Sequence, residues 1–169
     1  MSKNLYPYRR FPTIQAEPTS RAVRGTDAVK NKLHDLCLER DKSIITIECY
    51  PGVNDAEILS LFPKAALIIH ADELAIAPAE LDAKIEHELT DDNVFGIMTT
   101  WRLLDFYPSE ALCAAQKKIN AVESGLVIVY GVGASLVTRG DVLIYADLTR
   151  WEVQRSEEHT SELQSRGHL

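Results

Sequence analysis

The sequence predicts an α/β fold in which helices cover both faces of a parallel β-sheet. Four short runs rich in β-branched residues are separated by segments with helical periodicity. These runs are apolar throughout and do not alternate, which is typical of strands that are buried on both faces. A length of 169 residues, with 46% hydrophobic and 25% charged residues, suits one globular domain with a sizeable core.

Residues 1–25 are predicted to form an extended lead-in, because three prolines interrupt any helix there. Three aromatic side chains in the same stretch could anchor it on the body of the protein. These residues are Pro7, Pro12 and Pro18, together with Tyr6, Tyr8 and Phe11. The basic cluster of Arg9, Arg10, Arg21 and Arg24 is interpreted as part of a solvated tail, since little apolar periodicity surrounds it.

The α/β domain is predicted over residues 26–154, where strands and helices follow one another in the rhythm of a parallel sheet. The predicted strands are Ser43–Glu48, Ala65–His70, Gly125–Gly131 and Asp141–Ala146, with a further short strand at Val94–Met98. Five helices are predicted. The first begins at Thr26, the second spans Ala56–Phe62 and the third spans Pro78–Leu89. The fourth runs from Pro108 or Ser109 to Val122, and the fifth begins at Thr149. Asn54 or Asp55 can cap the second of these helices.

Residues 155–169 are predicted to be an artefactual tail. Residues 155–165 coincide with the translation of a common sequencing-library adapter, so they are not expected to belong to the fold. We therefore expect a C-terminally truncated domain whose last helix is incomplete. One face of the sheet would then be partly uncovered, and the chain would tend to associate.

Charge and composition exclude several classes of partner. A net charge of −7 opposes an electrostatic grip on nucleic acid or anionic lipid, so neither is expected as a partner. The longest apolar runs are far too short to span a bilayer. No secretory signal opens the chain, and Cys37, Cys49 and Cys113 lack disulfide or zinc spacing. These features predict a cytoplasmic protein.

The turn after the first predicted strand is where a phosphate-binding loop would lie. Such a loop needs glycine-rich backbone, a lysine for the terminal phosphates and a Ser or Thr hydroxyl for Mg²⁺. The segment Cys49–Glu57 offers one glycine, Gly52, and has acids where the lysine and hydroxyl should be. It is either a degenerate Walker A loop or an ordinary βα turn.

Other candidate ligand-binding residues stand at the ends of the later strands, where parallel sheets bind ligands. The motif containing Gly131, Gly133 and Ser135 is a weak match to a dinucleotide-binding loop that lacks its third glycine, or else a tight turn. Asp72 and Asp147 could be a general base or metal ligands, or could cap helices.

Three further residues have both a chemical and a structural interpretation. His70 and His87 find no third ligand in the sequence, so a packed or exposed histidine is favoured over a metal site. Cys49 precedes a helix N-terminus, where a lowered pKa could make its thiol reactive; the alternative is a small buried hydrophobic residue. No metal site and no catalytic residue is predicted within residues 1–154.

Three stretches resemble the uridine-kinase branch of the P-loop kinases. They are the strand–turn–helix at Ser43–Phe62, the strand ending in His70-Ala71-Asp72, and GLVIVYG followed by DVLIYADLTRWEVQ. The resemblance covers residues 26–154 and implies a three-layer kinase-like fold. The GK[ST] motif of those kinases is absent, and Tyr130 stands where they usually have Glu.

A second resemblance accounts for the absence of the GK[ST] motif. YPGVNDAE and YGVGASLVTRGDVLIYADLTRWEVQ are similar to the N-terminal domain of long bacterial class I mannose-6-phosphate isomerases, in which a kinase-like domain precedes a metal-binding cupin. The resemblance implies aldose–ketose isomerisation and zinc in a downstream cupin domain of the same chain, with no cofactor in this fragment. Two alternatives remain: a nucleoside or sugar kinase-like protein, and a non-catalytic domain that binds a phosphorylated sugar or nucleotide around Gly52 and Gly131–Ser135.

Overall fold

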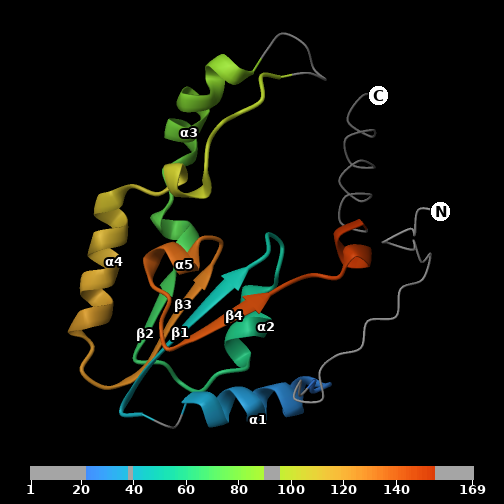
Figure 1. The fold of residues 1–169 in the computed structure, drawn as a ribbon, viewed down its shortest axis with the longest axis vertical. Coiled ribbons are helices and arrows are strands. Elements are labelled where there is room, and N and C mark those ends of the chain that lie inside the picture. The colour runs from blue at the N-terminus through green and yellow to red at the C-terminus, as the bar shows by residue number, and fades with distance from the viewer. Residues whose placement is uncertain (1–21, 38–39, 90–95, 155–169) are drawn as a thin grey trace, which may run out of the picture.

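The computed structural model describes residues 22–37, 40–89 and 96–154 (Figure 1). The strands are β1 (Lys42–Cys49), β2 (Leu67–His70), β3 (Gly125–Gly131) and β4 (Val142–Ala146). The α-helices are α1 (Thr26–Cys37), α2 (Asp55–Ser60), α3 (Pro78–Ile85), α4 (Ser109–Ala121) and α5 (Ala134–Val137). Short 3₁₀ helices are η1 (Ala71–Leu74), η2 (Glu86–Glu88) and η3 (Leu103–Phe106), and residues 150–154 are also helical.

The described strands form one parallel sheet with the order β2-β3-β1-β4. β1 lies beside β3 along its length, with Lys42 opposite Gly125 and Glu48 opposite Gly131. Among the described residues β4 pairs only with β1, so its outer edge carries no neighbouring strand. The predicted parallel α/β sheet is confirmed.

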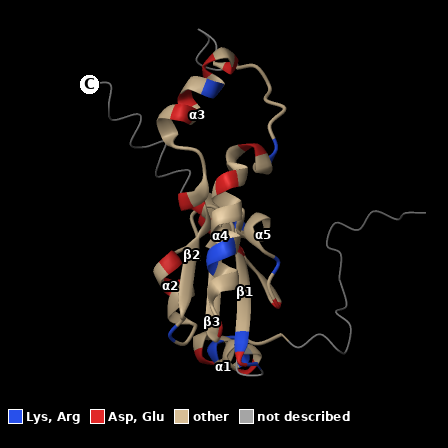
Figure 2. Cartoon of the chain, turned by 90° about the vertical axis from the view of Figure 1, so that its left-hand side faces the viewer, with Lys and Arg blue, Asp and Glu red and all other residues tan. Residues whose placement is uncertain are grey.

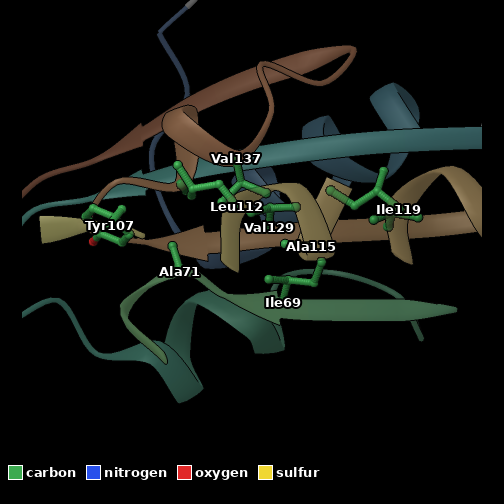
Figure 3. Packing of buried hydrophobic residues seen from close by; sticks show 10 residues of the cluster. Ile69, Ala71, Tyr107, Leu112, Ala115, Ile119, Val129 and Val137 are labelled. Atoms are coloured by element: carbon green, nitrogen blue, oxygen red, sulfur yellow. The ribbon is translucent and has the colours of Figure 1, made fainter. Parts of the chain in front are cut away.

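Helices cover the sheet on both sides, as predicted, which makes three layers. On one side α4 and α5 pack over Val127 and Val129 of β3 through a cluster shown in Figure 3, which includes Leu112, Ala115 and Val137. On the other side the alternate residues of β1 and β3 face residues of α1 and α2. This second cluster contains Ile45, Ile47, Leu126, Ile128 and Phe62, with Leu33, Ile58 and Leu59 packed against it.

The helix α3 does not lie on the sheet. It belongs to an arm that leaves the body after η1 and returns at η3, and it projects beyond the carboxyl ends of the strands (Figure 1). None of its residues is buried, although Leu81 and Ile85 are spaced on one side of the helix. Figure 2 shows that its charged residues are mainly acidic. The apolar periodicity of Pro78–Leu89 correctly indicated a helix, but it could not show that the helix lies off the sheet.

Two other expectations differ from the structure. Of the predicted strand Val94–Met98, residues 94–95 lie outside the described part, and residues 96–98 are not a strand. The helix α5 was not predicted: Gly133, at φ 75°, ends the turn after β3 and starts this short helix. Within the described residues, no helix is both long and apolar enough to cross a bilayer.

Candidate functional site

The strand order places a topological switch point between β1 and β3. From β1 the chain passes through α2 to β2 on one side, and from β3 it passes through α5 to β4 on the other. The two connections leave on opposite faces, and open α/β sheets bind ligands at the carboxyl ends of the strands at such a point. We name the residues gathered there the carboxyl-end cluster. It comprises Glu48, His70, Asp72, Tyr107, Tyr130 and the loop Gly131–Ser135.

The carboxylate of Glu48 holds the start of α5. Its Oε1 accepts the backbone N–H of Gly133 at 2.6 Å, and its Oε2 accepts that of Ser135 at 2.9 Å. An anionic acceptor strengthens both hydrogen bonds. The backbone donors that an anionic ligand would use in this loop are therefore already bound by a side chain of the protein.

Asp72 likewise accepts a backbone N–H group, in the middle of the loop Gly131–Ser135. Its Oδ1 accepts the N–H of Val132 at 2.8 Å. Gly131 permits this approach, because a Cβ built there would lie 2.9 Å from His70 Cδ2 and 3.1 Å from Asp72 Oδ1. Its φ of 110° also favours glycine. Asp72 thus fixes the turn through a backbone N–H, much as a helix cap would.

Tyr107, which follows the arm, closes the cluster from the α4 side. Its hydroxyl donates to the carbonyl oxygen of Val132 at 2.6 Å, and its ring fills the space beside Gly133. Burial, with the nearby charges of Asp72 and Glu48, raises the pKa of Tyr107 to about 12. The hydroxyl is therefore a neutral donor at physiological pH.

His70 lies between an aromatic ring and several acids. Its ring stacks on Tyr130 with centroids 4.5 Å apart and planes 2° from parallel. Its Nε2 lies 3.2 Å from Asp72 Oδ2 and 3.6 Å from Asp55 Oδ2. This nitrogen atom is buried and makes no hydrogen bond. In the described part of the chain, no group of three His, Cys, Asp or Glu side chains is arranged to hold a metal ion.

Cys49 is not an activated thiol. It is 6% exposed, and burial raises the pKa of its thiol. A hydrogen bond with the Gly131 backbone opposes this rise, while the charges of Asp55, Asp72 and Glu48 add to it. A helix N-terminus would lower the pKa of this thiol, but burial and the neighbouring carboxylates outweigh that effect. The alternative interpretation, a small buried hydrophobic residue, is correct.

The two strand-end aspartates do not face each other. Asp72 follows β2 and Asp147 follows β4, at opposite edges of the sheet with β3 and β1 between them. Three strand spacings separate them by about 14 Å. Asp147 accepts the N–H of its neighbour Leu148 at 2.8 Å, whereas Asp72 accepts that of Val132, which lies far away in the sequence.

Gly52 also lies apart from the carboxyl-end cluster. It sits in the turn after β1 at φ 96°, with Leu148 beside it, and lines a cavity of about 510 Å³ that we name the α2–β4 pocket. The same pocket contains Glu57, Asp147 and Glu152. Asn54 rather than Asp55 caps α2, since its side chain accepts the N–H of Glu57 at 3.2 Å. Among the described residues, no lysine or arginine lines the pocket.

Of the predicted ligand-binding residues, the fold brings Asp72, Gly131, Gly133 and Ser135 together and leaves Gly52 in a separate pocket. Sequence reasoning missed Glu48 and Tyr107. A signal existed for Glu48, because it is an acid near the end of an otherwise apolar strand. Tyr107 had no such signal, since it lies far from β3 in the sequence.

One family model matches the chain. It describes a domain of unknown function, DUF8485, and covers residues 25–165, which includes the whole α/β domain and extends into the segment that coincides with the adapter translation. No curated protein and no solved structure matches the chain significantly. The matched range is most of the sequence, and the chain therefore belongs to the DUF8485 family.

Proposed function

We propose that this domain is the non-catalytic N-terminal part of a cytoplasmic mannose-6-phosphate isomerase-like protein. The isomerisation would be carried out by a zinc-binding cupin further along the parent chain. The resemblance of YPGVNDAE and of the stretch from Tyr130 to Gln154 suggests the parent. The carboxyl-end cluster supports a non-catalytic role for this domain.

One observation carries the non-catalytic role: carboxylates of the protein bind the backbone N–H donors at the switch point. Glu48 binds the N–H groups of Gly133 and Ser135, and Asp72 binds that of Val132. A phosphate would have to displace two anions that are held by the fold itself. The turn after β1 opposes phosphate as well, because Asp55 and Glu57 stand in its helix and repel a triphosphate.

A cytoplasmic location is supported by the cysteines. Cys49 is buried with a free thiol, and Cys113 on α4 is exposed and free. An exposed unpaired thiol suits a reducing compartment.

Isothermal titration of the chain with Mg²⁺–ATP, and separately with mannose 6-phosphate, tests the non-catalytic role. We expect no binding heat for either ligand at millimolar concentration. Binding of ATP would favour the kinase-like alternative, and binding of the sugar phosphate would favour the phospho-ligand-binding alternative. Glu48→Ala is the informative variant, because it frees the N–H groups of Gly133 and Ser135. If the carboxylate blocks the site, this variant binds phosphate more tightly than the unsubstituted chain.

The identity of the parent protein is tested separately, on the uninterrupted gene. We expect its product to interconvert mannose 6-phosphate and fructose 6-phosphate in a coupled assay, and to lose that activity with a zinc chelator. Deleting residues 26–154 should leave the turnover number within a few-fold. A reading frame without a cupin would refute the assignment.

A further inference from the structure

The α2–β4 pocket has the form of a docking groove. Its walls are mostly apolar and include Ile58 of α2, the following Leu61 and Leu148 of the segment after β4, while Glu57 and Glu152 add negative charge. A volume of about 510 Å³ is enough for two large side chains. The groove therefore suits a partner that combines aromatic or aliphatic groups with positive charge.

The chain contains a segment with those properties. Residues 1–21 include four Lys or Arg and one Glu, a net charge of +3, whereas the remaining residues have a net charge of −10. Within this segment the six residues Tyr6–Phe11 place three aromatic side chains around Arg9 and Arg10. No other stretch of the sequence combines aromatic residues and arginine so densely.

From this charge and side-chain complementarity we propose that Tyr6–Phe11 docks in the α2–β4 pocket of its own chain. The aromatic side chains pack on the apolar walls, and Arg9 and Arg10 pair with Glu57 and Glu152. The linker is long enough for this contact, because the fourteen residues between Phe11 and α1 can span roughly 50 Å when extended. A covalently attached segment also has an effective concentration in the millimolar range, so modest affinity is sufficient.

A photo-cross-linking residue in place of Tyr8 of the full chain tests this docking. After irradiation and trypsin digestion, mass spectrometry should find cross-links to residues 53–61 or 146–152. The double variant Glu57→Lys/Glu152→Lys should lower their yield about five- to tenfold. Glu110→Lys/Glu123→Lys, which changes the net charge equally at exposed positions outside the pocket, should leave the yield unchanged.

A charge reversal in the N-terminal segment provides a second test of the docking. Arg9→Glu/Arg10→Glu changes only the segment, so it tests the docking even if the pocket variant fails to fold. Its cross-link yield should fall similarly, and combining it with Glu57→Lys/Glu152→Lys should restore the yield. Cross-links spread evenly over the chain, cross-links to residues 155–169, dimers cross-linked between two copies, or a yield insensitive to both charge reversals would each overturn the proposal.

Discussion

At the scale of single residues, Glu48 connects the central strand to the loop after its neighbour. Its carboxylate accepts two backbone N–H groups, from Gly133 and Ser135. We expect Glu48→Gln to lower the free energy of unfolding by about 1–2 kcal/mol, because one charge-assisted acceptor is replaced by an amide N–H₂ that cannot accept. Urea unfolding measures the change. Glu123→Gln, at an exposed carboxylate, is the matched control and should have almost no effect.

The pH dependence of stability provides a test of Tyr107. Its pKa is raised to about 12 in the folded state, so its contribution is complete below about pH 10, where the unfolded tyrosine is also neutral. That contribution is lost as the pH rises from about 10 towards about 12, since the unfolded chain ionises first. Stability should therefore decline steeply in this window.

Tyr107→Phe should reduce that decline. At neutral pH the variant loses about 1 kcal/mol, because the hydrogen bond to Val132 is gone. Between pH 10 and 12 its stability curve should be flatter than that of the parent sequence. Tyr50→Phe, at an exposed tyrosine, should leave the curve unchanged. If the unsubstituted chain and Tyr107→Phe gave parallel curves of stability against pH, the raised pKa of Tyr107 would be contradicted.

At the scale of elements, the turn from β3 into α5 depends on glycine for two reasons. Gly133 has φ 75°, and a Cβ there would lie 2.8 Å from Tyr107 Cζ and its hydroxyl oxygen. Gly133→Ala should cost about 2–4 kcal/mol, from backbone strain and from collision with the ring. Chemical denaturation gives the value.

A matched control separates the two causes. Gly25 also has positive φ, at 94°, but a Cβ there would meet nothing within 4 Å. Gly25→Ala should therefore show only the backbone strain, about 1–2 kcal/mol. Equal losses for the two variants would mean that contact with Tyr107 does not contribute.

At the scale of the whole molecule, the outer edge of β4 is the surface most prone to association. Leu143 and Tyr145 are 57% and 63% exposed on the face that α4 and α5 cover elsewhere, and no described strand lies beyond them. Unpaired backbone next to exposed apolar side chains promotes edge-to-edge pairing. The net charge of −7 opposes this association only partly.

We expect sedimentation velocity to show self-association of the chain at micromolar concentration. Leu143→Lys/Tyr145→Lys should increase the monomer fraction severalfold, because charges on an edge strand prevent pairing. Leu103→Lys/Leu104→Lys, at exposed leucines on the arm, should have a smaller effect. A parent sequence that is monomeric throughout would refute both this expectation and the one from the sequence.

Much of the fold could be predicted from the sequence because the core strands are continuous apolar runs. Gly125–Gly131 was predicted with the observed bounds, and Ser43–Glu48 lacks one residue at each end. The arm could not be predicted, because the spacing of Leu81 and Ile85 indicates a helix without indicating what it packs against. For the candidate site, Asp72 and the loop glycines were identified from their places at strand ends, whereas Tyr107 was not.

The sequence by itself determined the parallel α/β class, the buried strands and the acidic character of the turn after β1, because these depend on local composition and periodicity. Only the tertiary structure decided that β3 lies between β2 and β1. That strand order separates Asp72 from Asp147 and brings Glu48 to the N–H groups of Gly133 and Ser135. These are contacts between residues far apart in the chain, and their geometry depends on how the strands pair and cross over, which local periodicity does not encode.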